Sequence, residues 1–102
     1  MSIEVSNNET DQRYEIHVDG ALAGFAEYRL RPDALVFTHT QVLDAYEGQG
    51  LGGKLARGAL DDVRARGVRI RPRCPFIAAY IDRHPAYQDL VADRSEDAPQ
   101  QR

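Results

Sequence analysis

Hydrophobic and polar residues alternate along the first part of the chain, and this period of two predicts a series of β-strands. The alternation is short at residues 3–5, stops at the polar residues 6–9, and is regular over residues 14–18. Asp19-Gly20 comes next, a dipeptide that favours the type I′ turn of a two-residue hairpin. We therefore predict a short first strand, a turn at residues 6–9, and a second strand that leads into a hairpin.

The returning strand carries hydrophobic residues at even spacings, so we place them on one face of a sheet. They are Leu22, Ala26, Tyr28 and Leu30. Residues 31–33 include a proline and predict a turn, and residues 34–43 are rich in β-branched and aromatic side chains, which favours a fourth strand. The first half of the chain is thus predicted to be an antiparallel meander.

From residue 51 the hydrophobic period changes to about four, which predicts an amphipathic helix over residues 51–66 that packs on the sheet. The residues that recur are Leu51, Leu55, Ala59 and Val63. Gly67 suits the left-handed cap at the end of this helix. Residues 68–72 predict a fifth strand, and a helical connection makes it parallel to the fourth.

Pro75 suits the first position of a second, shorter helix, which His84-Pro85 ends. Its hydrophobic face consists of Phe76, Ile77, Tyr80 and Ile81, and a last packing element follows at Tyr87, Leu90 and Val91. The predicted fold is α/β, or α+β, with a mixed, mostly antiparallel sheet. We expect one domain over residues 1–92 and a disordered tail over residues 93–102.

Composition narrows the classes of function. The chain has 102 residues, a net charge of −3 with both signs well mixed, and one cysteine. The charge balance argues against a nucleic-acid or membrane partner, and a single cysteine excludes an internal disulfide. With no basic leader and no long apolar segment, we expect a cytoplasmic protein, and no cluster of residues points to a metal site.

The chemistry of the chain centres on a glycine-rich stretch between the fourth strand and the long helix, residues 46–54, which we call the glycine loop. The first amides of a helix lack intrahelical partners and point outward at the positive end of the macrodipole. Glycines let a phosphate approach those amides without a Cβ in the way. The loop therefore predicts an anion site, and the anion is most simply a phosphate group.

The amino-acid sequence of this loop matches three phosphate-binding motifs. Gly48-x-Gly50-x-x-Gly53 matches the dinucleotide fingerprint, but that motif belongs at the first strand of a parallel sheet and needs an acidic residue after the second strand. Gly48-x4-Gly53-Lys54 matches a P-loop, but Leu55 stands where a hydroxyl must hold magnesium. The third motif has Gly50 and Gly52 as its glycines and Glu47 at its start.

Through this third motif the chain resembles the GNAT superfamily of N-acetyltransferases, whose Q/R-x-x-G-x-G/A loop binds the pyrophosphate of acetyl-CoA. It is most similar to the small, single-domain Yjdj-type members. The matching segments are His39-Thr40, residues 46–52, Pro72-x-Cys74-Pro75-Phe76, Tyr80-Ile81 and His84-Pro85-x-Tyr87. The resemblance implies an acetyl-CoA-dependent N-acyltransferase acting on a small amine or on a protein or peptide amine, with coenzyme A as its ligand.

The same resemblance implies which residues contact the cofactor. They are Gln41, Val42 and Leu43 on the fourth strand, Glu47, Gly48, Gln49, Gly50, Leu51, Gly52 and Gly53 in the loop, and Cys74. The pantetheine arm is expected along the fourth strand, where it splays from the fifth. Glu47 replaces the usual Gln or Arg, so the backbone amides must contribute more of the interaction with the phosphate groups.

Three residues are implied in catalysis, and each has a simpler structural interpretation. His39 is a general base, or a histidine hydrogen-bonded at a sheet edge. Cys74 contacts the thioester, forms an acyl-cysteine, or is a small buried residue. Tyr80 protonates the leaving thiolate, or is a core tyrosine with its hydroxyl at the rim. We expect all three around one groove.

The alternative function is a non-catalytic acyl-CoA-binding or interaction module. Three departures from larger relatives favour it: Glu47 in the loop, Gln41 near the place where many GNAT enzymes carry a glutamate base, and the absence of the two N-terminal helices that shape the acceptor site. The basic cluster over residues 64–73 could meet the 3′-phosphate of coenzyme A or RNA, although such a run is usually a solvated face.

Overall fold

The meander predicted for the first half of the chain is present in the computed structural model, which describes residues 2–92. Its four strands are antiparallel neighbours in chain order. They are β1 (Ile3–Asn8), β2 (Arg13–Val18), β3 (Ala21–Arg31) and β4 (Ala34–Val42). The expected type I′ turn joins β2 to β3, with positive φ at both Asp19 and Gly20.

The second half adds helices and one parallel strand. A short 3₁₀ turn, η1 (Asp44–Tyr46), leads through the glycine loop into α1 (Leu51–Arg66), which ends at Gly67 in the left-handed conformation. β5 (Ile70–Pro72) pairs with β4 in parallel, α2 (Pro75–Arg83) follows, and η2 (Pro85–Leu90) is the last element. The predicted fold class, a mixed and mostly antiparallel sheet, is confirmed.

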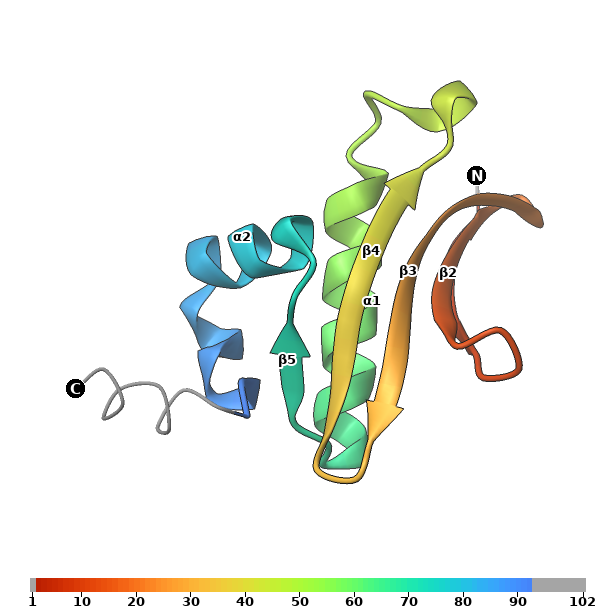
Figure 1. The fold of residues 1–102 in the computed structure, drawn as a ribbon. Helices are drawn as coiled ribbons and strands as arrows, with labels where there is room; N and C mark the ends of the chain where they lie inside the picture. The colour runs from red at the N-terminus through yellow and green to blue at the C-terminus, as the bar shows by residue number, and fades with distance from the viewer. Residues whose placement is uncertain (1, 93–102) are drawn as a thin grey trace.

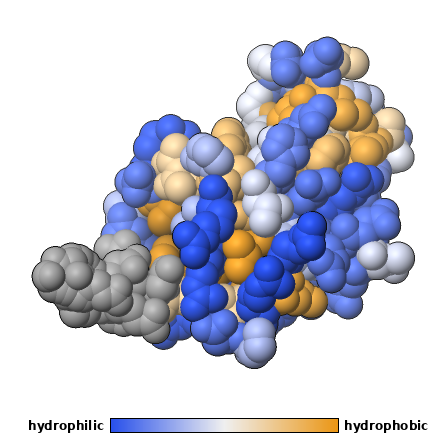
Figure 2. Space-filling view, in the orientation of Figure 1, coloured by the Kyte–Doolittle hydropathy of each residue, from blue (hydrophilic) through white to orange (hydrophobic). Residues whose placement is uncertain are grey.

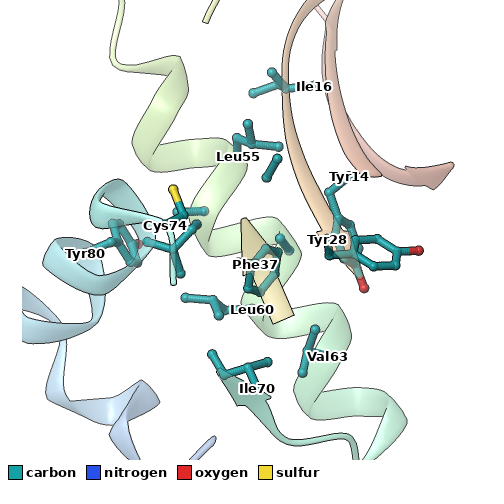
Figure 3. Packing of buried hydrophobic residues seen from close by; sticks show 14 of the residues in the cluster. Tyr14, Ile16, Tyr28, Phe37, Leu55, Leu60, Val63, Ile70, Cys74 and Tyr80 are labelled. Carbon is teal, nitrogen blue, oxygen red and sulfur yellow. The ribbon is translucent and has the colours of Figure 1, made fainter. Parts of the chain in front are cut away.

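One face of the sheet is covered by α1, whose hydrophobic side packs on β1, β2, β3 and β4, while β5 and α2 lie beside β4 (Figure 1). The core between helix and sheet contains Tyr14, Phe37 and Leu55 among its largest buried side chains (Figure 3). Within residues 2–92 no helix covers the opposite face of the sheet, which we call the open face.

The bounds of β1 and of β5 differ from the prediction. β1 extends to Asn8, because the polar residues expected to turn pair instead with β2, and Asn7 accepts the Tyr28 hydroxyl at 2.6 Å. β5 begins only at Ile70, because the Val68 N–H bonds back to the Val63 carbonyl in the cap of α1.

The assignment of one β3 face was wrong at its Leu22 end. Ile16 pairs with Gly24 and His17 with Leu22, so Ala23 is the extra residue of a β-bulge. The bulge shifts the alternation and buries Ala23 completely. Leu30, near the other end, keeps the predicted alternation with Tyr28 and is 58% exposed. The tail expected over residues 93–102 lies outside the described residues.

Candidate functional site

The N-terminus of α1 is left uncapped. Gly50 is the N-cap residue, no side chain bonds to the first amides, and the first turn contains no acidic residue. The first helical hydrogen bond runs from the Lys54 N–H to the Gly50 carbonyl at 3.4 Å. The N–H groups of residues 51–53 therefore have no intrahelical acceptor, and together with the helix dipole they form an anion-binding end.

The glycines of the loop do not all contribute only to the anion-binding end of α1. Gly48 and Gly50 have φ of +84° and +74°, which L side chains rarely adopt. A Cβ on Gly52 would lie 2.9 Å from the Phe76 ring, so this glycine lets α2 pack against α1. The sequence predicts that Gly52 and Gly53 admit a phosphate, and the structure gives Gly52 a packing role as well.

The other residues of the loop and of the end of β4 occupy varied environments. Glu47, Gly48 and Gln49 are exposed, and Glu47 forms no salt bridge within residues 2–92. The Leu51 side chain is in the core, so only its backbone N–H faces the loop. Val42 and Leu43 are half-buried, and the Leu43 N–H is already bonded to the Ala23 carbonyl at 2.8 Å.

β4 and β5 part after three paired residues. The pairing ends at Phe37 and Pro72, and the Cys74 N–H then donates to the Phe37 carbonyl at 3.0 Å as the chain turns into α2. From Thr38 to Val42 no strand of the described chain lies on the outer side of β4. This open edge is the splay that the family resemblance implied.

Cys74 and Tyr80 lie at this point of divergence, on the side of the sheet that α1 covers (Figure 3). The Cys74 Sγ is 3.2 Å from the Thr40 Oγ1, and the residue is 2% exposed. Tyr80 is 7% exposed and stacks on the His84 ring, with centroids 4.0 Å apart. Its hydroxyl has no hydrogen-bond partner among residues 2–92.

His39 lies on the open face, away from those two side chains. Glu27 pairs with His39 and Tyr28 with Phe37, so Thr38 is an extra residue in a second bulge. Because Tyr28 and Phe37 face α1, His39 faces the other way. Its Nε2 is 3.4 Å from the Gln41 Oε1, and both residues are exposed. The structure therefore brings together Cys74 and Tyr80, but not His39.

Sequence reasoning missed a set of basic residues beside the loop. Lys54, Arg57 and Arg83 line a hollow of about 360 Å³. The other lining residues are Gly50, Gly53, Tyr80 and His84. The i, i+3 spacing of Lys54 and Arg57 directly after the loop was a signal that could have found two of them. Nothing in the sequence places Arg83 beside them, since that depends on how α2 packs.

The basic cluster over residues 64–73 lies instead near the other end of α1, and three of its members are paired. Arg64 bonds to Asp89, Arg66 to Asp62 and Glu9, and Arg71 to Asp33. The hydrogen bonds from Arg64 lower the pKa of the Asp89 carboxyl. These pairs support the interpretation of this cluster as a solvated face.

Comparison with known proteins places this site in a family. Residues 13–90 match the sequence model of the family described as GCN5-related N-acetyl-transferase. The chain belongs to this GNAT family. The resemblance noted from the sequence is thereby confirmed, and the matched residues include the glycine loop, the parting of β4 from β5, and α2.

Individual relatives agree with this assignment. Protein NATD1 of Homo sapiens and of Gallus gallus is 38% identical over 52 residues, 51% of this chain and 46% and 47% of theirs, so the match spans about half the length of these relatives. A GCN5-like protein from Staphylococcus aureus has a solution structure with a TM-score of 0.66 and 25% identity, covering 90% of this chain and 91% of that one.

A larger N-acetyltransferase shares the fold alone. The crystal structure of a ribosomal-protein-alanine N-acetyltransferase from Brucella melitensis biovar Abortus 2308 has a TM-score of 0.55 at 22% identity. It covers 78% of this chain, which covers 60% of that protein. Neither helix within residues 2–92 combines the length and hydrophobicity that a membrane crossing requires.

Proposed function

We propose that this chain binds acetyl-CoA, or a related acyl-CoA, and transfers the acyl group to the amine of a small molecule, protein or peptide. The observation that carries the proposal is the uncapped N-terminus of α1 beside the open edge of β4, in a member of the GNAT family. The free amides suit a pyrophosphate, and an edge strand offers backbone groups to an extended arm.

The cofactor contacts that we propose are those implied by the resemblance, with one refinement. Gln41, Val42 and the loop residues 47–53 remain in the proposal, with Leu51 acting through its backbone alone. Leu43 would act through its carbonyl or side chain, because its N–H is bonded to Ala23. Acyl-CoA supplies an activated thioester, which we place where Cys74 meets Thr40.

Acyl transfer requires the amine to lose a proton and the departing thiolate to gain one. Tyr80 is the proposed proton donor, because its hydroxyl has no other partner in the described chain. His39 is the proposed proton acceptor for an amine that approaches over the open face. Direct transfer is favoured over an acyl-cysteine, since the Cys74 thiol is buried and contacts Thr40.

A non-catalytic acyl-CoA-binding module is the second candidate, and the position of His39 favours it. His39 and the neutral Gln41 lie on the open face, whereas Cys74 and Tyr80 lie on the helix side. Radiolabelled acetyl-CoA offered with a panel of amines separates the two functions. The enzyme predicts labelled amine and a fall in kcat with Tyr80→Phe and with His39→Gln; hydrolysis that neither change affects indicates the module.

Binding itself is tested with an isosteric pair at the N-cap. Gly50 is exposed, with no atom within 4 Å of an added Cβ, and Asn and Asp tolerate its positive φ better than other residues. We expect coenzyme A to raise the melting temperature of the wild-type protein by several degrees, because it binds only the folded state. Gly50→Asp should abolish that rise by placing a carboxylate beside the free amides, and Gly50→Asn should largely keep it.

Two outcomes of this experiment contradict the proposal. If about 1 mM coenzyme A leaves the wild-type melting temperature unchanged, the protein does not bind the cofactor at a useful affinity. If the Asp and Asn variants respond equally, the phosphate groups bind somewhere other than the α1 N-terminus.

A further inference from the structure

A hollow beside the turn between β3 and β4, which we call the arginine hollow, collects positive charge. It measures about 350 Å³. Arg31 lines it from the end of β3, and Arg71 and Arg73 line it from β5 and the turn that follows. The half-buried Val36 of β4 adds an apolar wall. In Figure 2, two hydrophilic stripes flank hydrophobic surface in this half of the open face.

The register of the strands puts these arginines on the open face. Arg29 pairs with Val36, and Val36 pairs with Arg71, so the three form one row across β3, β4 and β5. Phe37, next in β4, lies in the core under α1, so the row faces the other way. Arg31 follows Arg29 by two residues and shares its face. Because neighbouring strands are about 4.8 Å apart, the β3 and β5 backbones lie about 10 Å apart on either side of β4.

Three of the four arginines carry charge that the described chain leaves unpaired. Arg29, Arg31 and Arg73 are exposed and form no salt bridge within residues 2–92. Arg71 differs, because it donates to both carboxylate oxygens of Asp33, at 3.2 and 2.7 Å. Asp33 is the one acidic residue of the described chain that lines the hollow. The surface around the arginine hollow therefore keeps an excess of positive charge.

This charge lies next to the opening between β4 and β5. Arg73 directly precedes Cys74, whose Sγ is 3.2 Å from the Thr40 Oγ1. His39, the proposed proton acceptor, follows Val36 by three residues on the open face of β4. At about 3.3 Å per residue, the two positions are about 10 Å apart along the strand. A peptide whose amine reaches the opening can thus extend about three residues and place a side chain in the arginine hollow.

The chemistry of the arginine hollow favours a carboxylate-bearing peptide over nucleic acid. A guanidinium binds a carboxylate through two parallel hydrogen bonds, and an extended peptide has the same rise per residue as the strand beneath it. Nucleic-acid bases bind by stacking on exposed aromatic rings, and none lines this hollow in the described chain. The net charge of −3 for the whole chain also opposes the approach of a long polyanion.

We propose that Arg29, Arg31 and Arg73 bind an acidic segment of a peptide or protein acceptor, so that the protein selects amines about three residues from a carboxylate. The inference rests on the proposed function and names the class of acceptor. The acceptor amine lies at the opening beside His39, and the acidic side chain lies in the arginine hollow.

Rates of acetylation of synthetic peptides by the full chain test the inference. The peptides have their N-terminal amine as the only acceptor and differ only at the fourth residue, which is glutamate, glutamine or arginine. At low ionic strength, we expect kcat/KM to be at least fivefold higher for the glutamate peptide than for the glutamine peptide, because its carboxylate gains guanidinium partners. Arg31→Ala and Arg73→Ala should each reduce this preference, and the double variant should remove it.

Charge reversal separates recognition from general damage to the protein. The double variant Arg31→Glu and Arg73→Glu should prefer the arginine peptide, because the sign of the hollow is inverted. Arg73→Lys keeps the charge and should retain most of the preference for glutamate. Arg66→Ala removes an arginine that is paired with Asp62 and Glu9 and lies outside the arginine hollow, so it should leave the preference intact.

Three outcomes would overturn this inference while leaving the proposed function standing. They are equal kcat/KM for the glutamate and glutamine peptides, a preference that Arg66→Ala lowers as much as the double alanine variant does, and acetylation of small amines but of no peptide. If no amine of any kind is labelled and coenzyme A does not raise the melting temperature, the proposed function fails as well.

Discussion

At the scale of single residues, the contact between Cys74 and Thr40 defines where the sheet opens. The two side chains come from β4 and from the start of α2, and they meet just beyond the last β4–β5 pair. Cys74 is 2% exposed, so its thiol behaves first as a packed core group. A thiol in this state has little access to bulk solvent.

Alkylation kinetics test this state of Cys74 directly, because the chain contains one cysteine. We expect iodoacetamide to modify the native protein at least tenfold more slowly than the urea-unfolded protein, since burial shields the thiol. Saturating coenzyme A should slow the native reaction further by filling the opening beside it. Cys74→Ser is the control that reports no labelling. Native labelling as fast as in urea would show that the thiol is open, and would favour the acyl-cysteine route.

Residues whose role is set by local backbone geometry were the predictable ones. Asp19-Gly20 and Gly67 lie where their conformational preferences place them, and both have positive φ. The role of Gly52 depends instead on Phe76, which is far along the chain and arrives only when α2 packs on α1. Arg83 was missed for the same reason, since no spacing in the sequence reports a tertiary neighbour.

At the scale of elements, the two β-bulges decide which side chains face the site. The bulge at Ala23 and the bulge at Thr38 each shift the alternation by one residue. Hydrophobic alternation predicted the strands themselves, because burial on one face sets their period. It could not locate the bulges, and so it grouped His39 with Cys74 and Tyr80 although the second bulge turns His39 to the open face.

The packing of α1 on the sheet predicts that alanine substitutions at two of its glycines have different effects on stability. A Cβ on Gly58 would lie 2.8 Å from the Val5 Cβ, whereas a Cβ on Gly53 would have its nearest neighbour, in Tyr80, at 3.9 Å. Alanine favours a helix over glycine by about 1 kcal/mol at either site, but overpacking costs about 1 to 3 kcal/mol. We therefore expect Gly58→Ala to be less stable than Gly53→Ala by about 1 to 3 kcal/mol in urea unfolding. Equal stabilities would mean that β1 yields to the added methyl group at little cost.

At the scale of the whole molecule, the covered and open faces of the sheet differ in the groups that they offer to a ligand. The helices leave free amides and unpaired cations at one end of α1, and the paired arginines at the other end add little attraction for an anion. Figure 2 shows that the open face is mixed: hydrophobic residues gather toward the end of β4 that leads into the glycine loop, and hydrophilic residues lie in stripes over the opposite half. The amine acceptor that we propose would thus meet both kinds of surface as it approaches β4.

The molecule also has an apolar hollow, which is a second candidate ligand site besides the N-terminus of α1. It measures about 220 Å³ and lies near the C-terminal end of α1, with Tyr28, Leu35 and Val63 among its walls. Its polar lining is already engaged, since Tyr14 bonds to Asp62, Tyr28 to Asn7, and Arg66 to Asp62 and Glu9, so it offers few free polar groups to a phosphate. Burial, followed by the bond to Asp62, raises the pKa of Tyr14, which keeps that hydroxyl protonated at neutral pH.

Hydrogen exchange with and without coenzyme A distinguishes the two ends of α1. The amides of residues 51–53 have no acceptor in the helix and should exchange from the native state, so general stabilisation of the fold by a ligand cannot slow them. We expect coenzyme A to slow exchange there and along the unpaired edge of β4, because its phosphates and pantetheine arm cover these groups. The half of β1 that pairs with β2 near Val18 should change only as far as global stability does, since β1 lies three strands from β4. Slowed exchange confined to the walls of the apolar hollow, with residues 51–53 unaffected, would place the ligand at the wrong end of α1 for acyl transfer at Cys74 and Tyr80.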